Sequence, residues 1–130
     1  MSPPVLERAK SGRSACRATG EFIGEGDWRV GVEAFRAGRL TMTWFQPKAF
    51  LKEAVQVEYS PNGRARCKGD DSVIEAGEVR LAFISGGSKA YYRPAQAAAF
   101  LAEVLRKVPE LKGFDLASLA GLTDLDQGHQ

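Results

Sequence analysis

The stretch Ala9–Phe35, AKSGRSACRATGEFIGEGDWRVGVEAF, decides the architecture of this chain because the chain repeats it. At an offset of 51 residues, without a gap, Ser60–Phe83 reads SPNGRARCKGDDSVIEAGEVRLAF. Seven positions are identical in the two copies: Glu7 and Glu58, Gly12 and Gly63, Arg13 and Arg64, Cys16 and Cys67, Ile23 and Ile74, Gly26 and Gly77, Arg29 and Arg80. Identities at Gly, Cys and Arg rarely arise by chance, so the sequence predicts an internal duplication.

The composition fits a small soluble protein. A chain of 130 residues forms one compact domain or two very small ones, and 44% apolar and 26% charged residues are ordinary values. No run approaches the ~18 apolar residues of a membrane span, so no membrane partner is expected. The N-terminus lacks the apolar core of a secretory signal. Its Arg and Ser content resembles an organelle presequence, but Glu7 and the early start of the repeat argue against one.

The two cysteines and the charges carry further information. Cys16 and Cys67 occupy equivalent positions without any CxxC pair, which favours inheritance by duplication and a reducing compartment. The net charge of +2 conceals an asymmetry: residues 1–55 carry nine basic and six acidic side chains (+3), and residues 56–130 carry nine and ten (−1). The first copy is therefore the half expected to meet a polyanion.

Hydrophobic periodicity predicts the same elements twice. Alternation of apolar residues and the positions of Gly and Pro indicate a strand, a hairpin and a short helix in the first copy: Val5–Ala9, Trp28–Trp44 with a turn at Phe35–Gly38, and Lys48–Val55. The second copy is expected to contain a hairpin, a longer helix and a capping segment: Val79–Tyr92 with a turn at Ser85–Ser88, Ala95–Val108, and Gly113–Asp126.

Four motifs in order resemble the zinc-finger fold of poly(ADP-ribose) polymerases and DNA ligase III. They are AKSGRSAC (Ala9–Cys16), DWRVGV (Asp27–Val32), TWFQPKAF (Thr43–Phe50) and GFDL…DLDQ (Gly113–Gln127). The resemblance implies an α+β fold of two small hairpin-and-helix repeats packed together, residues 1–55 and 56–130. It also implies a nuclear location and a part in DNA repair.

The metal ligands of that family are missing. Where the family has CxxC and HxxC, the first copy has Cys16, Thr19, Gln46 and Ala49, and the second has Cys67, Asp70, Arg93 and Gln96. Neither set can complete a tetrahedral zinc site, so no zinc and no other cofactor is expected. Thr19 and Ala49 are expected to fill the former metal volume. Asp70 and Arg93 form either an ion pair or two independently solvated side chains. Packing of the copies on each other would replace the metal.

In the family, such fingers bind DNA at ends and strand breaks. They hold the sugar-phosphate backbone without reading base sequence, and apolar hairpin residues stack on the exposed terminal base pair. The resemblance implies phosphate-binding residues at Lys10, Arg13, Arg29, Arg64 and Arg80, and base-stacking residues at Phe35 and Leu40. Two alternatives stay open: Arg13 and Arg64 pairing internally with Glu7 and Glu58, and Leu40 packing in the core.

The sequence also bears on two other function classes. A duplicated finger without metal suits a protein-interaction or structural subunit of a larger assembly, docking through Phe45, Tyr91 and Tyr92. No enzymatic activity and no small-molecule substrate are expected, because the only histidine, His129, is in the tail. A phosphate-binding loop and a nucleophile elbow are also missing from the sequence.

Overall fold

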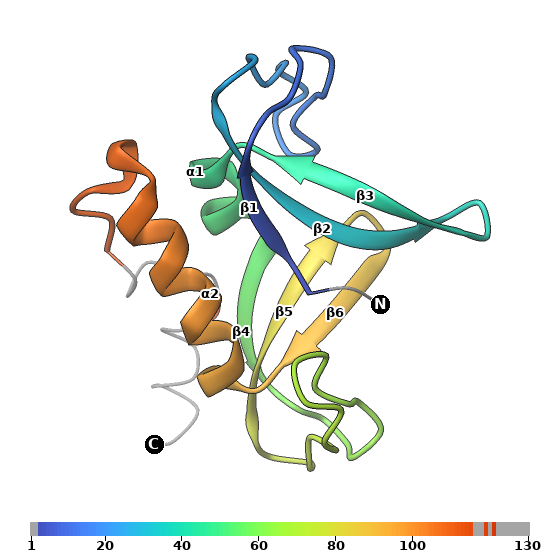
Figure 1. Ribbon diagram of the computed structural model, residues 1–130. Coiled ribbons are helices and arrows are strands. Elements are labelled where there is room, and N and C mark those ends of the chain that lie inside the picture. The colour runs from blue at the N-terminus through green and yellow to red at the C-terminus, as the bar shows by residue number, and fades with distance from the viewer. Residues whose placement is uncertain (1–2, 116–118, 120, 122–130) are drawn as a thin grey trace.

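Two three-stranded antiparallel sheets form the framework of this α+β protein (Figure 1). The computed structural model describes residues 3–115, 119 and 121. The first sheet has the order β1-β2-β3, with β1 (Val5–Arg8), β2 (Trp28–Arg36) and β3 (Arg39–Phe45). The second has the order β4-β5-β6, with β4 (Val55–Tyr59), β5 (Val79–Ser85) and β6 (Ser88–Tyr92). The helical elements are α1 (Pro47–Ala49), the π-helical turn η1 (Phe50–Ala54), α2 (Pro94–Lys107) and the 3₁₀ turn η2 (Pro109–Leu111).

The backbone repeats itself at the offset predicted from the sequence. The bridge between Ala15 and Phe22 recurs between Arg66 and Val73. The turns before β2 and β5 each contain a glycine in the left-handed region, at φ +84° and +85°, where a side chain would be strained: Gly26 and Gly77. The seven identities of the sequence therefore reflect a duplicated three-dimensional unit.

Each pair of long strands forms a tight hairpin. Ala37 and Gly38, at φ +50° and +79°, close the β2–β3 hairpin, a conformation suited to the twist of the flanking strands. Gly86 and Gly87 lie between β5 and β6. The first turn is tighter than expected, because the strands continue to Arg36 on one side and start again at the next residue after Gly38.

The expected helix Lys48–Val55 is wrong in its second half. One α-helical turn is followed by the π-helical turn η1, and Val55 already belongs to β4, opposite Phe83. The wider turn brings Phe50, Leu51 and Ala54 into the interior. A β-branched residue such as Val55 suits a strand better than a helix end, which explains the early change. The second helix agrees with its prediction within one residue at each end.

Both repeats contribute to one hydrophobic core. Phe50 is fully buried at its centre, with ring centroids 5.7 Å from Phe45, 5.2 Å from Phe83 and 6.2 Å from Phe100. Since these rings come from both repeats and from α2, the repeats do not form two separate beads. α2 packs against β5, and η2, which follows α2, contacts α1.

The C-terminal capping segment falls largely outside the described residues. Of the expected segment Gly113–Asp126, the structure describes Gly113–Asp115, Leu119 and Gly121, and both Phe114 and Leu119 pack against the core. Among the described helices, none is long and apolar enough to span a membrane.

Candidate functional site

In the first repeat, the positions that align with the zinc ligands of the resembled fingers form hydrogen bonds. The Gln46 backbone N–H donates to Cys16 Sγ over 3.3 Å, and the Thr19 hydroxyl donates to Gln46 Oε1 over 3.0 Å. Burial alone would raise the pKa of the Cys16 thiol, but hydrogen bonds from Thr19, Gln46 and Ala18 lower it overall. Thr19, Gln46 and Ala49 also line an open cavity of about 620 Å³, and the expectation that Thr19 and Ala49 fill the volume of a metal ion stays a prediction.

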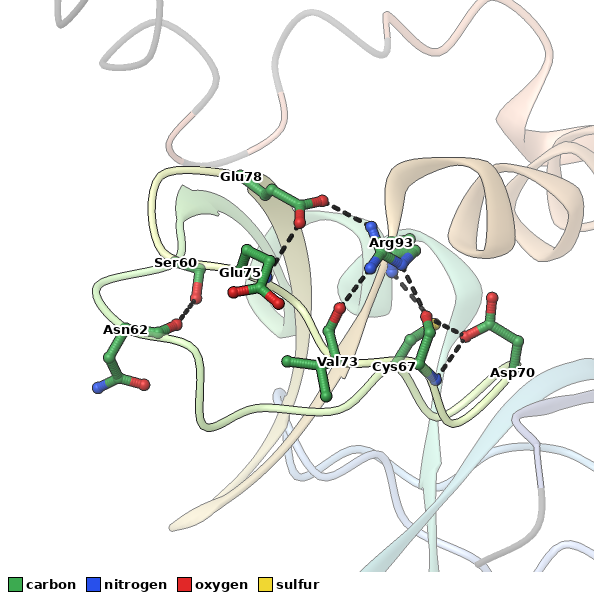
Figure 2. A network of polar contacts seen from close by, with 9 residues as sticks. Ser60, Asn62, Cys67, Asp70, Val73, Glu75, Glu78 and Arg93 are labelled. Carbon is green, nitrogen blue, oxygen red and sulfur yellow. Dashed lines mark hydrogen bonds and ion pairs between the residues drawn. The ribbon is translucent and has the colours of Figure 1, made fainter.

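In the second repeat, one arginine connects the segments that a metal would join (Figure 2). The Arg93 backbone N–H donates to Cys67 Sγ over 3.3 Å. Its side chain donates through Nε to Ser72 Oγ over 2.8 Å and through Nη1 to Glu78 Oε2 over 2.6 Å, and Nη2 donates to the Val73 carbonyl. Three side-chain donors thus tie the start of α2 to the loop between β4 and β5.

Asp70 does not form the direct ion pair with Arg93 that the sequence suggested. The Ser72 hydroxyl donates to Asp70 Oδ1 over 2.6 Å, and accepts from Arg93, so it links the two residues. Hydrogen bonds from Ser72 are the main reason why the pKa of Asp70 is lowered. The pKa of Glu78 is also lowered, first by the Glu75 backbone N–H and then by Arg93.

These residues do not fit a zinc ion in either repeat. A guanidinium group occupies the second site, and a cation there opposes binding of another cation. In the part of the chain that the structure describes, no three His, Cys, Asp or Glu side chains gather into a metal-binding group.

The two strand arginines are buried structural residues. Arg29 Nη2 lies 2.7 Å from Glu7 Oε2, and its guanidinium carbon lies 3.5 Å from the centre of the Trp44 ring. The second repeat has the same arrangement among Arg80, Glu58 and Tyr91, with distances of 2.6 Å and 3.8 Å. Arg29 and Arg80 are only 8% and 6% exposed, so they present little surface to a ligand.

The loop arginines, in contrast, are exposed. The alternative that Arg13 and Arg64 pair with Glu7 and Glu58 is wrong, because both carboxylates bond the strand arginines. The β-sheet register explains this choice, since Glu7 lies directly opposite Arg29. Lys10, Arg13 and Arg64 are exposed and form no ion pair with any other described residue.

A basic groove of about 590 Å³ opens on the second repeat. Among the described residues, its lining includes five cationic side chains, one aromatic side chain and no acidic one: Arg64, Arg66, Lys68, Arg80, Lys89 and Tyr91. Arg80 is neutralised by Glu58, so four charges remain for a ligand. The net charge of −1 over residues 56–130 conceals this groove, because none of the described acidic side chains belongs to its lining.

Three of the groove cations were missed by the sequence reasoning. Arg66 and Lys68 flank Cys67 in the loop, and Arg66 also donates to the Asp71 carbonyl over 3.0 Å. Lys89 is two residues from Tyr91 on β6, so both side chains lie on the same face of the sheet. That alternation was readable in the sequence, but only the fold brings the strand and the loop together.

The predicted stacking residues meet at the tip of the first hairpin. Phe35 and Leu40 are directly opposite each other in the β2–β3 ladder and are 60% and 48% exposed. The alternative that Leu40 packs in the core is therefore wrong. The prediction that Phe45, Tyr91 and Tyr92 form an exposed docking surface is also wrong. Phe45 and Tyr92 are only 2% and 5% exposed, and Tyr91 is partly buried.

Together these features describe a small α+β protein of two repeats, in which the described residues offer no fitting zinc site. The protein carries a cationic groove on one repeat and an exposed apolar pair on the hairpin of the other. No protein-family model matches the chain, and no curated protein matches it.

Proposed function

We propose that this protein is a DNA-binding module that holds the sugar-phosphate backbone without reading base sequence. The observation that carries the proposal is the basic groove of the second repeat, whose lining includes five cations and no acidic side chain. Exposed Arg and Lys side chains commonly contact phosphates. Such contacts fix the position of a protein on DNA but do not read the base sequence. Arg64, Lys68 and Lys89 are exposed and free of ion pairs with other described residues.

The groove itself favours backbone contacts over base contacts. The Arg80 guanidinium lies 3.8 Å from the ring centre of Tyr91, the one aromatic side chain in the lining. A base would have to displace this buried and ion-paired arginine to stack on that side of the ring. Lys10 and Arg13 are further exposed cations in the corresponding loop of the first repeat.

We further propose a preference for DNA ends or strand breaks. Phe35 and Leu40 form an exposed apolar pair at the end of a hairpin that projects away from the helices (Figure 1). A terminal base pair offers an apolar face that such side chains can cover, whereas continuous duplex does not. With the motifs of the sequence, this arrangement supports kinship with the fingers of poly(ADP-ribose) polymerases, and hence a nuclear role in DNA repair.

A salt titration tests the proposal. Binding of blunt, nicked and hairpin-closed duplex is measured by fluorescence anisotropy at increasing salt. With four available groove cations, the logarithm of the affinity is expected to fall with the logarithm of salt at a slope of about −3 to −4. Arg64→Gln with Lys68→Gln reduces the slope by about 2, whereas the matched pair Arg106→Gln with Lys112→Gln, exposed and outside the groove lining, leaves it unchanged.

Two outcomes would remove the DNA-binding proposal: no binding at low salt, or equal effects of the two double variants. The end preference is tested separately with Phe35→Ser and Leu40→Ser. These changes should abolish tighter binding to blunt or nicked DNA and leave hairpin-closed duplex unaffected. Phe22→Ser is the control, because Phe22 is 73% exposed and lies outside the hairpin.

The alternative function is a protein-interaction or structural subunit of a larger assembly that no longer binds DNA. The same exposed pair, Phe35 and Leu40, supports it, because an apolar surface at a hairpin tip also suits a protein partner. The absence of any salt-sensitive DNA binding would favour this alternative.

A further inference from the structure

The exposed cations of the groove, Arg64, Arg66, Lys68 and Lys89, are called the anion track. We propose that this track crosses the β5–β6 turn and continues onto Arg17 of the first repeat, so that one nucleic-acid strand contacts both repeats. This inference rests on the proposed backbone binding and adds the path of the ligand. It also adds Arg17 to the site, a residue that neither the motifs nor the groove lining includes.

Arg17 lies against the turn of the other repeat. A Cβ atom added to Gly86 would lie 3.0 Å from Arg17 Nη2, so the guanidinium group packs directly over this glycine. The backbone of Arg17 is fixed as well, since its N–H donates to the Trp44 carbonyl over 2.9 Å. The side chain is exposed and forms no ion pair with another described residue. It is therefore a positioned cation with its charge available.

The turn leaves a path between Arg17 and the groove. Gly86 and Gly87 are both exposed, and nothing lies within 4 Å of a Cβ added to Gly87. Lys89 follows two residues later, exposed at the edge of the groove that it lines. Side chains that would block a backbone are thus missing at the crossing.

The dimensions suit one strand of nucleic acid. Three residue steps along β6 separate Tyr91 in the groove from Ser88 at the turn, which is about 10 Å of strand. The path from the groove through Lys89 to Arg17 therefore follows a single hairpin edge. A ligand occupying all of it must be extended, because cations from two loops and one strand are arranged in sequence along the edge.

The crossing is specific to the second repeat. At the position equivalent to Lys89 the first repeat has Met42. Its hairpin closes through Ala37 and Gly38 next to the exposed pair Phe35 and Leu40, and not through two glycines. In contrast, Arg17 is equivalent to Lys68 at the offset of 51, so both copies retain a cation there. The duplicated loop cations thus belong to one continuous track, whereas the two hairpins have diverged.

The experiment measures binding of oligothymidylates of about four and about twelve nucleotides, two lengths within the range of known single-strand site sizes. Arg17→Gln should weaken binding of the long probe by about 3- to 10-fold at low salt and reduce its salt slope by about 0.7, the contribution of one phosphate contact. The short probe should be unaffected, because the groove alone holds it. Arg17→Lys should retain most of the affinity for the long probe.

Lys52→Gln is the matched control, because Lys52 is an exposed cation of the first repeat outside the track. Equal affinities of Arg17→Gln and Lys52→Gln for both probes would overturn the inference. If Arg64→Gln with Lys68→Gln still weakened binding in that case, the proposed function would stand without the crossing. If that pair had no effect either, both proposals would fall. Thermal unfolding of each variant verifies that the fold is intact.

Discussion

Replacing Arg29 by methionine separates a structural role from a phosphate-binding role. Arg29 Nε and Nη2 both donate to Glu7 Oε2, and Nη1 donates to Ser14 Oγ over 3.1 Å. Its guanidinium also stacks on the Trp44 ring. Methionine fills part of the same volume but removes the charge and all three donors. Glu7 would then remain beside the sheet without its partner.

The expected cost follows from the burial of the two partners. Removing one partner of a fully buried ion pair costs about 3–5 kcal/mol. Arg29 is 9% exposed in its side chain but Glu7 is 32% exposed, so the carboxylate can regain water. We therefore expect the free energy of unfolding to fall by about 2–3 kcal/mol. The melting temperature should fall by about 6–15 °C for a chain of this size.

Urea unfolding followed by tryptophan fluorescence measures this change, since Trp44 lies next to the substituted residue. Arg13→Met is the control, because Arg13 is exposed and the same loss of charge should change stability by less than about 0.5 kcal/mol. Adding Glu7→Gln to Arg29→Met should recover part of the loss. The reasoning would be refuted if Arg29→Met were as stable as Arg13→Met and bound DNA less tightly, which would indicate a phosphate ligand.

Three further predictions concern the core and the former metal sites. Arg93→Met should lower the free energy of unfolding by about 2 kcal/mol, whereas Gln46→Met at the equivalent position should cost less than about 1 kcal/mol, because it loses one exposed side-chain bond. Equal costs in urea unfolding would contradict this difference. Phe50→Ala should cost about 3–5 kcal/mol and leave one unfolding transition, because both repeats share the core; two calorimetric transitions would contradict it. Folding lowers the pKa values of Glu78 and Asp70. The stability that these two carboxylates contribute is therefore present at pH values above their ordinary pKa values, and it is lost as the pH falls through the lowered pKa values. Unfolding measured from about pH 6 to pH 3 should show this loss, and Arg93→Met should diminish it.

Sequence reasoning succeeded where the information is local. The alternation around Trp28 and Val79 predicted both hairpins, and the apolar stripe after Pro94 predicted α2. Phe35 and Leu40 were named from the family resemblance, and the structure places them opposite each other near the hairpin turn. The helix after Pro47 was predicted too long, since local propensity does not reveal the pairing of Val55 with Phe83.

The candidate site depended more on pairing than on motif. Arg13 and Arg29 were both predicted to bind phosphate. In the structure Arg13 is exposed, whereas Arg29 is buried and paired with Glu7. The register of β1 against β2 decides this, and a shift of one residue would place Glu7 on the other face. The position of Lys89 beside the Arg64 loop likewise depends on how β6 meets a loop more than 20 residues away in the sequence.

The sequence by itself determined the duplication, the absence of any CxxC or HxxC pair and the order of the elements, because each is recorded in residues at fixed spacing. The tertiary structure alone decided that both repeats share a core around Phe50. It also decided that Arg93 ties its loop to Glu78, and that Arg17 meets the turn at Gly86. These contacts join segments distant in the chain, and their geometry follows from sheet register and core packing, which no short window of sequence contains.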